Sequence, residues 1–224
     1  MLSLIDALAT SPWGPLLSPE ELARVAAEMV EKRIPAGAPA CRKGEPVEAW
    51  IGVIEGLVKM TSLSPEGKSV TFTGVPAGGW FGEGSLLKYP EPRRYDVIAV
   101  RESRVAYLPR ASFNRLLDTH ISFNRFLLKQ LNERLGQFIA VIETDRLLEP
   151  DARVARALAQ LFNPLLYPHT AAFLQLSQEE IGLLSGVSRQ RANQALQVLE
   201  KAGLVKVEYG GVRVLDVDGL RQFS

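Results

Sequence analysis

The stretch from residue 177 to 194 holds the side chains with the clearest chemical use. Guanidinium and amide groups can form paired hydrogen bonds with the base edges exposed in the major groove of DNA. Here they share one face of a predicted helix whose first residue is a capping serine: Ser188, Arg189, Gln190, Arg191, Asn193 and Gln194. The opposite face is apolar and is expected to turn inward: Ala192, Ala195, Leu196, Val198 and Leu199. The pattern predicts a helix that presents hydrogen-bonding groups to base pairs.

A short helix precedes this face and must hold it in place. Ser177 and Glu180 have the spacing of a capping box, in which each side chain satisfies a backbone donor of the other residue. Ile181 and Leu184 provide an apolar side, and Gly186 supplies a turn residue that tolerates positive φ. Two helices joined in this way predict a helix-turn-helix whose second helix contacts DNA. The alternative is an ordinary pair of packed helices with one polar face.

Two runs after the second helix alternate apolar and polar residues. They cover residues 204–207 and 212–215, and Gly210-Gly211 lies between them. Alternation around a glycine turn predicts a β-hairpin. A hairpin directly after a helix-turn-helix is the wing of a winged-helix domain, and wings rest on phosphates. We therefore expect Lys206 and Arg213 to contact the DNA backbone.

A second chemical cluster is glycine-rich and spans residues 78–87, with two arginines close behind it. Glycine-rich turns allow backbone N–H groups to approach an anion. A glutamate can accept a hydrogen bond from a sugar hydroxyl, and an arginine can pair with a phosphate. The candidate ligand-binding residues are Gly82, Glu83, Gly84, Ser85, Arg93 and Arg94. The alternative is a tight turn in which the glycines serve geometry and Glu83 pairs with Arg93.

Short β-type runs fill the region from residue 33 to 108. They are residues 50–54, 57–61, 69–72, 95–100 and 104–108, separated by glycine and proline. Many short strands at this spacing predict a β-roll or barrel. Before this region, Ser18 and Pro19 start a helix that we expect to run to about Lys32. Residues 1–17 are expected to be a loose lead-in.

A long helix is predicted from about Ile121 to Leu147, after a short one over residues 111–117. Within the long helix, an apolar residue recurs at steps of three and four: Leu128, Leu131, Leu135, Phe138 and Ile142. Such a heptad seam predicts pairing with the same helix of a second copy. The alternative is that the stripe packs on the chain's own β-domain, a contact for which three other residues are suited: Phe126, Leu127 and Ile139.

The predicted α+β organisation has three parts. Residues 1–118 form the β-roll domain with its flanking helices, residues 119–148 the dimerisation helix, and residues 149–224 the winged helix-turn-helix domain. Glu149-Pro150-Asp151 marks the hinge, because proline cannot continue the preceding helix. A helix from Arg153 to Leu161 is expected to open the last part.

Composition limits the classes of function. The 224 residues carry a net charge of +1, so DNA binding would depend on the local placement of cations. No apolar run is long enough to span a membrane and no signal peptide is evident, so we expect a soluble, cytoplasmic protein. The single cysteine, Cys41, excludes an internal disulfide and a cysteine-held cluster. The sequence has no nucleophile–base pair, metal-ligand spacing or Walker loop, so we expect no catalytic residue, no metal site and no enzymatic activity.

Together these parts resemble the cyclic-AMP receptor/fumarate-nitrate regulator (CRP/FNR) family of bacterial transcription factors. The resemblance covers nearly the whole chain, including the long helix and the winged helix at 177–215. Its β-roll motifs are Pro35-Ala36-Gly37, Arg42-Lys43-Gly44-Glu45, Glu55-Gly56-Leu57-Val58-Lys59 and Phe81-Gly82-Glu83. The resemblance implies a cyclic-nucleotide-binding-type β-roll that senses a small ligand and shifts DNA affinity. It also implies a homodimer, a palindromic site in double-stranded DNA, and contact with RNA polymerase.

Two departures from the family pattern bear on the ligand. In members that respond to cyclic AMP, the phosphate-binding arginine is followed by Ser or Thr and a small residue, whereas Arg93 is followed by Arg94 and Tyr95. The family reads adenine with polar residues of the long helix, and alignment places Phe138 and Ile139 there. An apolar pair cannot hydrogen-bond the base. A cyclic nucleotide beside Phe138 is thus a candidate ligand, cyclic AMP matches the pattern only in part, and no cofactor is assigned.

A third departure bears on the DNA sequence. Relatives that recognise a GTGA-type half-site have Glu and Arg at the positions of Gln190 and Gln194. Glutamine suits adenine, and arginine suits guanine. We expect a palindrome that differs from the GTGA type, with Arg189 on a guanine. Two other functions stay open: a cyclic-nucleotide-binding subunit that acts through protein contacts, and a regulator that needs no ligand.

Overall fold

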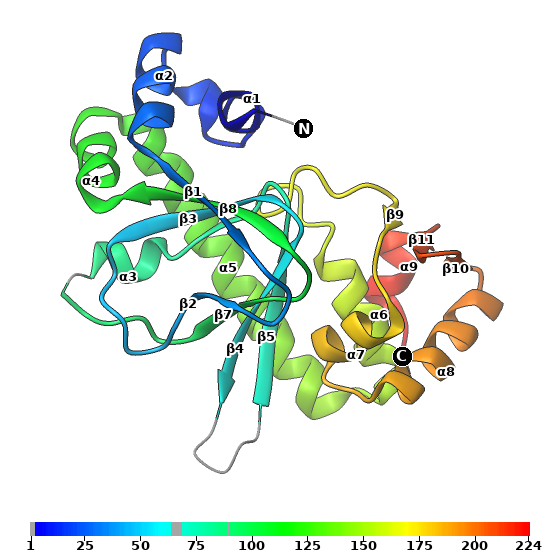
Figure 1. Ribbon diagram of the computed structural model, residues 1–224. Helices are drawn as coiled ribbons and strands as arrows, with labels where there is room; N and C mark the ends of the chain where they lie inside the picture. Colours follow the sequence, from blue (N-terminus) through cyan, green and yellow to red (C-terminus); the bar gives the residue numbers. More distant parts are fainter. Residues whose placement is uncertain (1–2, 64–68, 89) are drawn as a thin grey trace.

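Two antiparallel four-stranded sheets form the N-terminal half of the chain (Figure 1). The computed structural model describes residues 3–63, 69–88 and 90–224. The first sheet has the order β1 (Val30–Ile34), β8 (Ser103–Pro109), β3 (Ala49–Glu55) and β6 (Trp80–Phe81). The second has the order β2 (Pro39–Cys41), β7 (Asp96–Ala99), β4 (Leu57–Leu63) and β5 (Ser69–Pro76). Residues of both sheets, among them Ile51, Val53, Val58 and Val75, share one buried cluster, so the sheets are the walls of a β-roll.

The five predicted strands are confirmed as β3, β4, β5, β7 and β8, with ends that differ by a few residues. Strands β1, β2 and β6 are additional to the prediction. The helix that starts at Ser18 is α2 (Pro19–Glu28), which ends four residues before the expected Lys32. The reason is that the next residues, Val30–Ile34, pair with β8 along their whole length.

Residues 3–17 pack onto the β-roll, so the expected loose lead-in is wrong. Helix α1 (Leu4–Ala9) is capped by Ser3, and a short 3-10 helix follows at Gly14–Leu16. Leu8 and Trp13 are fully buried. The Trp13 ring meets Trp80 edge-on, with ring centroids 5.1 Å apart. The same apolar cluster holds α2, α4 (Arg110–Thr119) and the start of the long helix against the first sheet.

The long helix α5 (Ile121–Leu147) agrees with the prediction at both ends. From Leu128 onward its polarity is the reverse of an ordinary surface helix. The side chains buried on the β-roll side include three polar ones: Gln130, Arg134 and Gln137. Three residues of the heptad seam are instead 67%, 59% and 54% exposed: Leu128, Leu135 and Ile142. Most of the apolar stripe therefore faces away from the chain's own β-domain.

Only part of the seam touches the β-roll. Phe138 packs edge-on against Phe72 of β5, with ring centroids 6.4 Å apart. Phe126 and Leu127 are buried against the domain, as expected for that contact. Ile139, expected beside them, is exposed, because it lies on the side of the helix that carries Leu135 and Ile142.

The C-terminal part is a winged helix (Figure 1, yellow to red), and its apolar core also takes in Leu57 of β4. Its helices are α6 (Pro150–Gln160), α7 (Gln178–Ser185), α8 (Arg189–Lys201) and α9 (Val217–Gln222). Helix α6 begins at Pro150 rather than at Arg153, because proline is well suited to the first helical position. The three-stranded sheet has the order β10 (Val205–Glu208), β11 (Gly211–Val214) and β9 (Phe173–Leu174). The predicted hairpin is confirmed, although its two-residue turn is Tyr209-Gly210 rather than Gly210-Gly211.

Within the part of the chain that the structure describes, no helix combines the length and apolarity needed to cross a membrane. Over the same residues, no group of three or more His, Cys, Asp or Glu side chains is placed to hold a metal ion.

Candidate nucleic-acid interface and ligand cavity

The first helix of the helix-turn-helix begins with the predicted capping box. Ser177 Oγ accepts a hydrogen bond from Glu180 N at 3.2 Å, and Glu180 Oε2 accepts one from Ser177 N at 2.6 Å. The helix ends at Gly186, whose φ of 65° lies in the left-handed region that glycine adopts without strain. Cap and turn together fix where the second helix begins.

The second helix, α8, divides into a buried and an exposed face. Ser188 caps it by accepting a hydrogen bond from Arg191 N at 3.2 Å. The buried residues are Ala192, Ala195, Leu196 and Leu199. Val198, which was expected to face inward, is exposed at the edge of this face. The side chains of Arg189, Gln190 and Gln194 all lie in solvent, where they are free to reach base edges.

Arg191 and Asn193, also predicted to face DNA, are engaged with neighbouring helices. Arg191 Nη1 lies 2.7 Å from Asp151 Oδ1 in α6. Asn193 Oδ1 accepts a hydrogen bond from Gln178 Nε2 in α7 at 2.8 Å. These two residues therefore brace α8 against the rest of the domain, while the other three polar residues stay available.

The wing carries one solvent-exposed cation and one paired cation. Lys206 is exposed on β10. Arg213 donates two hydrogen bonds to the Glu208 carboxylate, at 2.9 and 3.1 Å, and lies over the Phe173 ring. The pairing lowers the pKa of Glu208, so the carboxylate offsets the charge of Arg213 at neutral pH. Of the two predicted phosphate contacts, only Lys206 has an uncompensated charge.

A cavity of 540 Å³ lies between α5 and the glycine-rich segment of the β-roll. Six of the seven predicted ligand residues line it: Gly82, Glu83, Gly84, Ser85, Arg94 and Phe138. The structure adds two further cations to the lining, Lys88 and Arg134. Apolar side chains close the rest, among them Phe72, Tyr95, Leu131 and Ile142.

Arg93, the seventh predicted residue, is placed elsewhere. Its side chain is buried, and Nη2 donates to Ala49 O at 3.1 Å. The next two residues, Arg94 and Tyr95, lie in a bend before β7 and both line the cavity. Arg94 is exposed and pairs with Glu91, with Nη2 and Oε2 2.7 Å apart. The arginine predicted to face a phosphate is therefore not the one that the cavity presents.

Glu83 is held by residues that the sequence analysis did not connect with it. Trp50 Nε1 donates to Glu83 Oε2 at 3.2 Å, and Arg134 Nε lies 3.7 Å from Oε1. Arg134 also donates to Trp80 O at 2.7 Å. The alternative in which Glu83 pairs with Arg93 is therefore wrong. The available signal was the spacing of Gln130, Arg134 and Gln137, a polar row opposite the exposed leucines.

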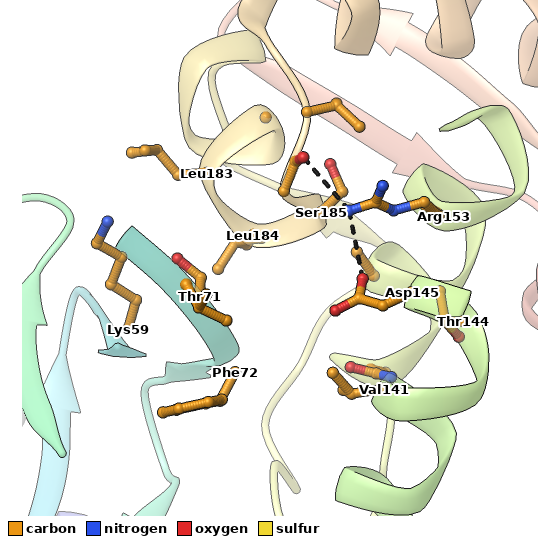
Figure 2. Close-up of a pocket in the computed structure, with 16 residues that line it drawn as sticks. Lys59, Thr71, Phe72, Val141, Thr144, Asp145, Arg153, Leu183, Leu184 and Ser185 are labelled. Carbon is orange, nitrogen blue, oxygen red and sulfur yellow. Dashed lines mark hydrogen bonds and ion pairs between the residues drawn. The ribbon is translucent and has the colours of Figure 1, made fainter. Parts of the chain in front are cut away.

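A second cavity, of 330 Å³, lies between the β-roll and the winged helix (Figure 2). Lys59 of β4 stands on one side of it, and partial burial lowers its pKa. On the other side, Arg153 Nη2 lies 3.3 Å from Asp145 Oδ1 and donates to Gly186 O at 3.3 Å. These bonds join the end of α5, the start of α6 and the turn of the helix-turn-helix.

An ion pair also joins the two domains. Arg101 of the β-roll lies 2.8 Å from Glu180 Oε1 and donates to Gln175 O. The other oxygen of the same carboxylate closes the capping box. Glu180 thus connects the local structure of α7 to the position of the whole domain.

Known families match both halves of the chain. Residues 31–120 match the model of the cyclic nucleotide-binding domain, and residues 152–223 match that of the Crp-like helix-turn-helix domain.

Individual relatives match across most of the chain. The chain is 30% identical over 183 residues to transcriptional regulator LdrP of Thermus thermophilus, which covers 80% of this chain and 89% of LdrP. It is 28% identical over 216 residues to the cyclic AMP receptor protein of the same organism, which covers 96% and 97% of the two chains. The structure of FixK2 from Bradyrhizobium japonicum superimposes with a TM-score of 0.71 at 18% identity, over 88% of this chain and 97% of FixK2. At that identity, the likeness to FixK2 supports the fold alone.

Proposed function

Because the chain belongs to the CRP/FNR family of DNA-binding transcription regulators, we propose that it works as a homodimer on a palindromic site in double-stranded DNA. The observation that carries this proposal is the exposed face of α8. Arg189, Gln190 and Gln194 lie in solvent, whereas every buried residue of α8 is apolar. Side chains of these types are suited to base edges in the major groove.

The dimer would form through α5. Exposing Leu128, Leu135 and Ile142 on one long helix leaves an apolar strip in water, and pairing with a second copy would remove it. A two-fold axis along α5 would also present two copies of α8 to successive turns of the DNA. The three-part division at residues 118/119 and 148/149 follows from this arrangement, with α5 as the shared element.

The cavity beside Glu83 would take a small anion that carries an apolar or aromatic part. Lys88, Arg94 and Arg134 line it. An anion there would compete with Glu91 for Lys88 and Arg94, and with Glu83 for Arg134. A cyclic nucleotide has this chemistry and remains the first candidate. Adenine-specific hydrogen bonds have no counterpart at Phe138, so we expect the base, if one binds, to be held by ring contacts.

The proposed partners, DNA and RNA polymerase, also determine where in the cell the protein would act. A bacterial regulator of this family acts where the chromosome and RNA polymerase are, so we place the protein in the cytoplasm with RNA polymerase as its functional partner.

The test is selection of binding sites from random double-stranded DNA by the purified protein. We expect a palindrome with half-sites about one helical turn apart. Arg189→Ala should bind the selected site about 5- to 150-fold more weakly, since a bidentate contact to guanine contributes about 1–3 kcal/mol. Glu179→Gln, on the first helix, serves as the control. Failure to select any sequence would contradict the proposal. Titration with cyclic AMP and cyclic GMP, followed by calorimetry, then examines the cavity separately.

A further inference from the structure

A loop of the winged helix is inserted into the core of the β-roll. The loop joins α6 to β9 and spans residues 161–172. Leu166 and Tyr167 on this loop are buried, and they belong to the same apolar cluster as Val53 and Val75 of the β-roll. This loop is therefore a buried attachment of the DNA-binding part to the sensor part, in addition to the hinge after α5 and the Arg101–Glu180 ion pair.

The loop packs closely against the Gly78-Gly79 turn of the β-roll. A Cβ atom at Gly78 would lie 2.6 Å from His169 Cδ2, and one at Gly79 would lie 3.1 Å from Tyr167 Cδ1. Both distances are shorter than ordinary contacts, so a side chain at either glycine would crowd the loop. At Gly79 it would also meet the β-roll itself, because Val75 Cγ1 lies only 2.5 Å from that Cβ position.

The Tyr167 hydroxyl ends in a buried polar network on α5 and β5. It lies 3.2 Å from Gln137 Nε2, 3.4 Å from Thr73 Oγ1 and 3.5 Å from Arg134 Nη1. Asn163, earlier in the loop, donates to Glu133 Oε2 at 2.8 Å. Buried groups of this kind are costly to leave unpaired, which ties the loop to this stretch of α5.

Arg134 is where this network meets the ligand cavity. Its guanidinium lies against Glu83 on one side and Tyr167 on the other, and it lines the cavity. We infer that Tyr167 is a positioning residue through which an occupant of the cavity, acting on Glu83 and Arg134, sets the place of the DNA-binding domain. The expected effect on DNA binding rests on the proposed function, whereas the attachment of the loop through Tyr167 does not.

The first experiment follows backbone amide exchange in the DNA-free protein. Tyr167→Phe keeps the ring and removes the hydroxyl. We expect exchange in residues 162–172 to rise roughly two- to tenfold, the range for loss of one net hydrogen bond. Tyr107→Phe is the matched control, because Tyr107 Oη donates to Ala40 O at 2.9 Å entirely inside the β-roll.

The second experiment measures coupling. Glu83→Gln removes the charge beside Arg134 and should also raise exchange in residues 162–172, although Glu83 touches none of them. Combined with Tyr167→Phe, its effect should be less than additive. Three results would each overturn the inference. They are exchange at the wild-type rate in residues 162–172 of Glu83→Gln, strictly additive effects of the two substitutions, and an equal rise of that exchange in Tyr107→Phe.

A DNA arm separates this inference from the proposed function. On the selected site, Glu83→Gln should change affinity in the wild-type background and lose that effect in the Tyr167→Phe background. If the protein binds no DNA while the exchange results hold, the proposed function fails, and the attachment of the loop through Tyr167 is still supported. If it binds DNA and Glu83→Gln acts equally in both backgrounds, the inference fails alone.

Discussion

Single residues decide what this protein recognises. Of the five α8 side chains predicted to face DNA, two are used internally, Arg191 by Asp151 and Asn193 by Gln178. Under the proposed function, base recognition would fall to Arg189, Gln190 and Gln194. The arginines near the ligand cavity also differ in what they contact. Arg93 is bound to a backbone carbonyl, whereas Arg94 and Arg134 line the cavity.

Gln190→Glu should change the preferred base at one symmetric pair of positions in the palindrome. Glutamine pairs with adenine N6 and N7, whereas glutamate accepts from cytosine N4. Site selection repeated with the variant measures the change, and discrimination of about 1–3 kcal/mol between bases is expected. An unchanged palindrome would mean that Gln190 does not contact a base.

Cys41 should be chemically inert in the folded protein. Burial raises the pKa of its thiol from 9.0 to about 11, so the reactive thiolate is scarce at neutral pH. Alkylation should therefore proceed only through unfolding, at a rate that rises with denaturant. Because the folded pKa is higher than the unfolded one, this group's contribution to stability is complete below pH 9 and declines as pH rises toward 11. Fast stoichiometric labelling at pH 7 would contradict this.

At the scale of elements, local signals in the sequence sufficed where one segment determines its own structure. The capping box at Ser177, the glycine turn at Gly186 and the heptad spacing of α5 predicted their elements closely. Strands β1 and β6 could not be predicted, because they exist through pairing with β8 and β3. The Gly78-Gly79 turn was interpreted as an approach for an anion, and its partner is a loop about ninety residues away in the chain.

A substitution on the exposed seam of helix α5 should prevent dimerisation without unfolding the chain. Leu135→Lys places a charge at the centre of the apolar seam, at a position that is exposed in the single chain. We expect a folded monomer by sedimentation equilibrium, with much weaker binding to the palindrome. Lys129→Ala, exposed on the same helix but off the seam, should remain dimeric. A dimeric Leu135→Lys protein would place the interface elsewhere.

At the scale of the whole molecule, the two domains are held together by contacts that do not involve the hinge. Arg101 and Glu180 pair across the interface, and Leu184 lies against Gly74 of β5. The loop with Tyr167 adds a buried attachment. Swinging the winged helix about Leu148 would break all of these contacts at once.

Glu180→Gln should loosen the interface while keeping α7 intact. Glutamine also suits the capping box, but it gives up the charge that faces Arg101. We expect the free energy of unfolding to fall by about 0.5–1 kcal/mol, since the pair is only partly exposed. Amide exchange should rise around residues 175–177, and Glu179→Gln, with the same loss of charge, should leave it unchanged. Equal effects in the two variants would show that the Arg101 contact adds nothing.

The pairing of β9 with β11 connects the loop directly to the sheet of the wing. Residues 161–172 lead directly into Phe173–Leu174, which forms the third strand of the wing sheet, and Ala172 O accepts a hydrogen bond from Val214 N at 2.8 Å. A displacement of Tyr167 would therefore pass through β9 to the hairpin that is proposed to contact phosphates. Contacts to phosphates set overall affinity and its dependence on salt, whereas contacts to bases set the ratio between sequences. Under the proposed function, a signal that travels this way would adjust how much DNA is occupied and leave the choice of sequence to α8.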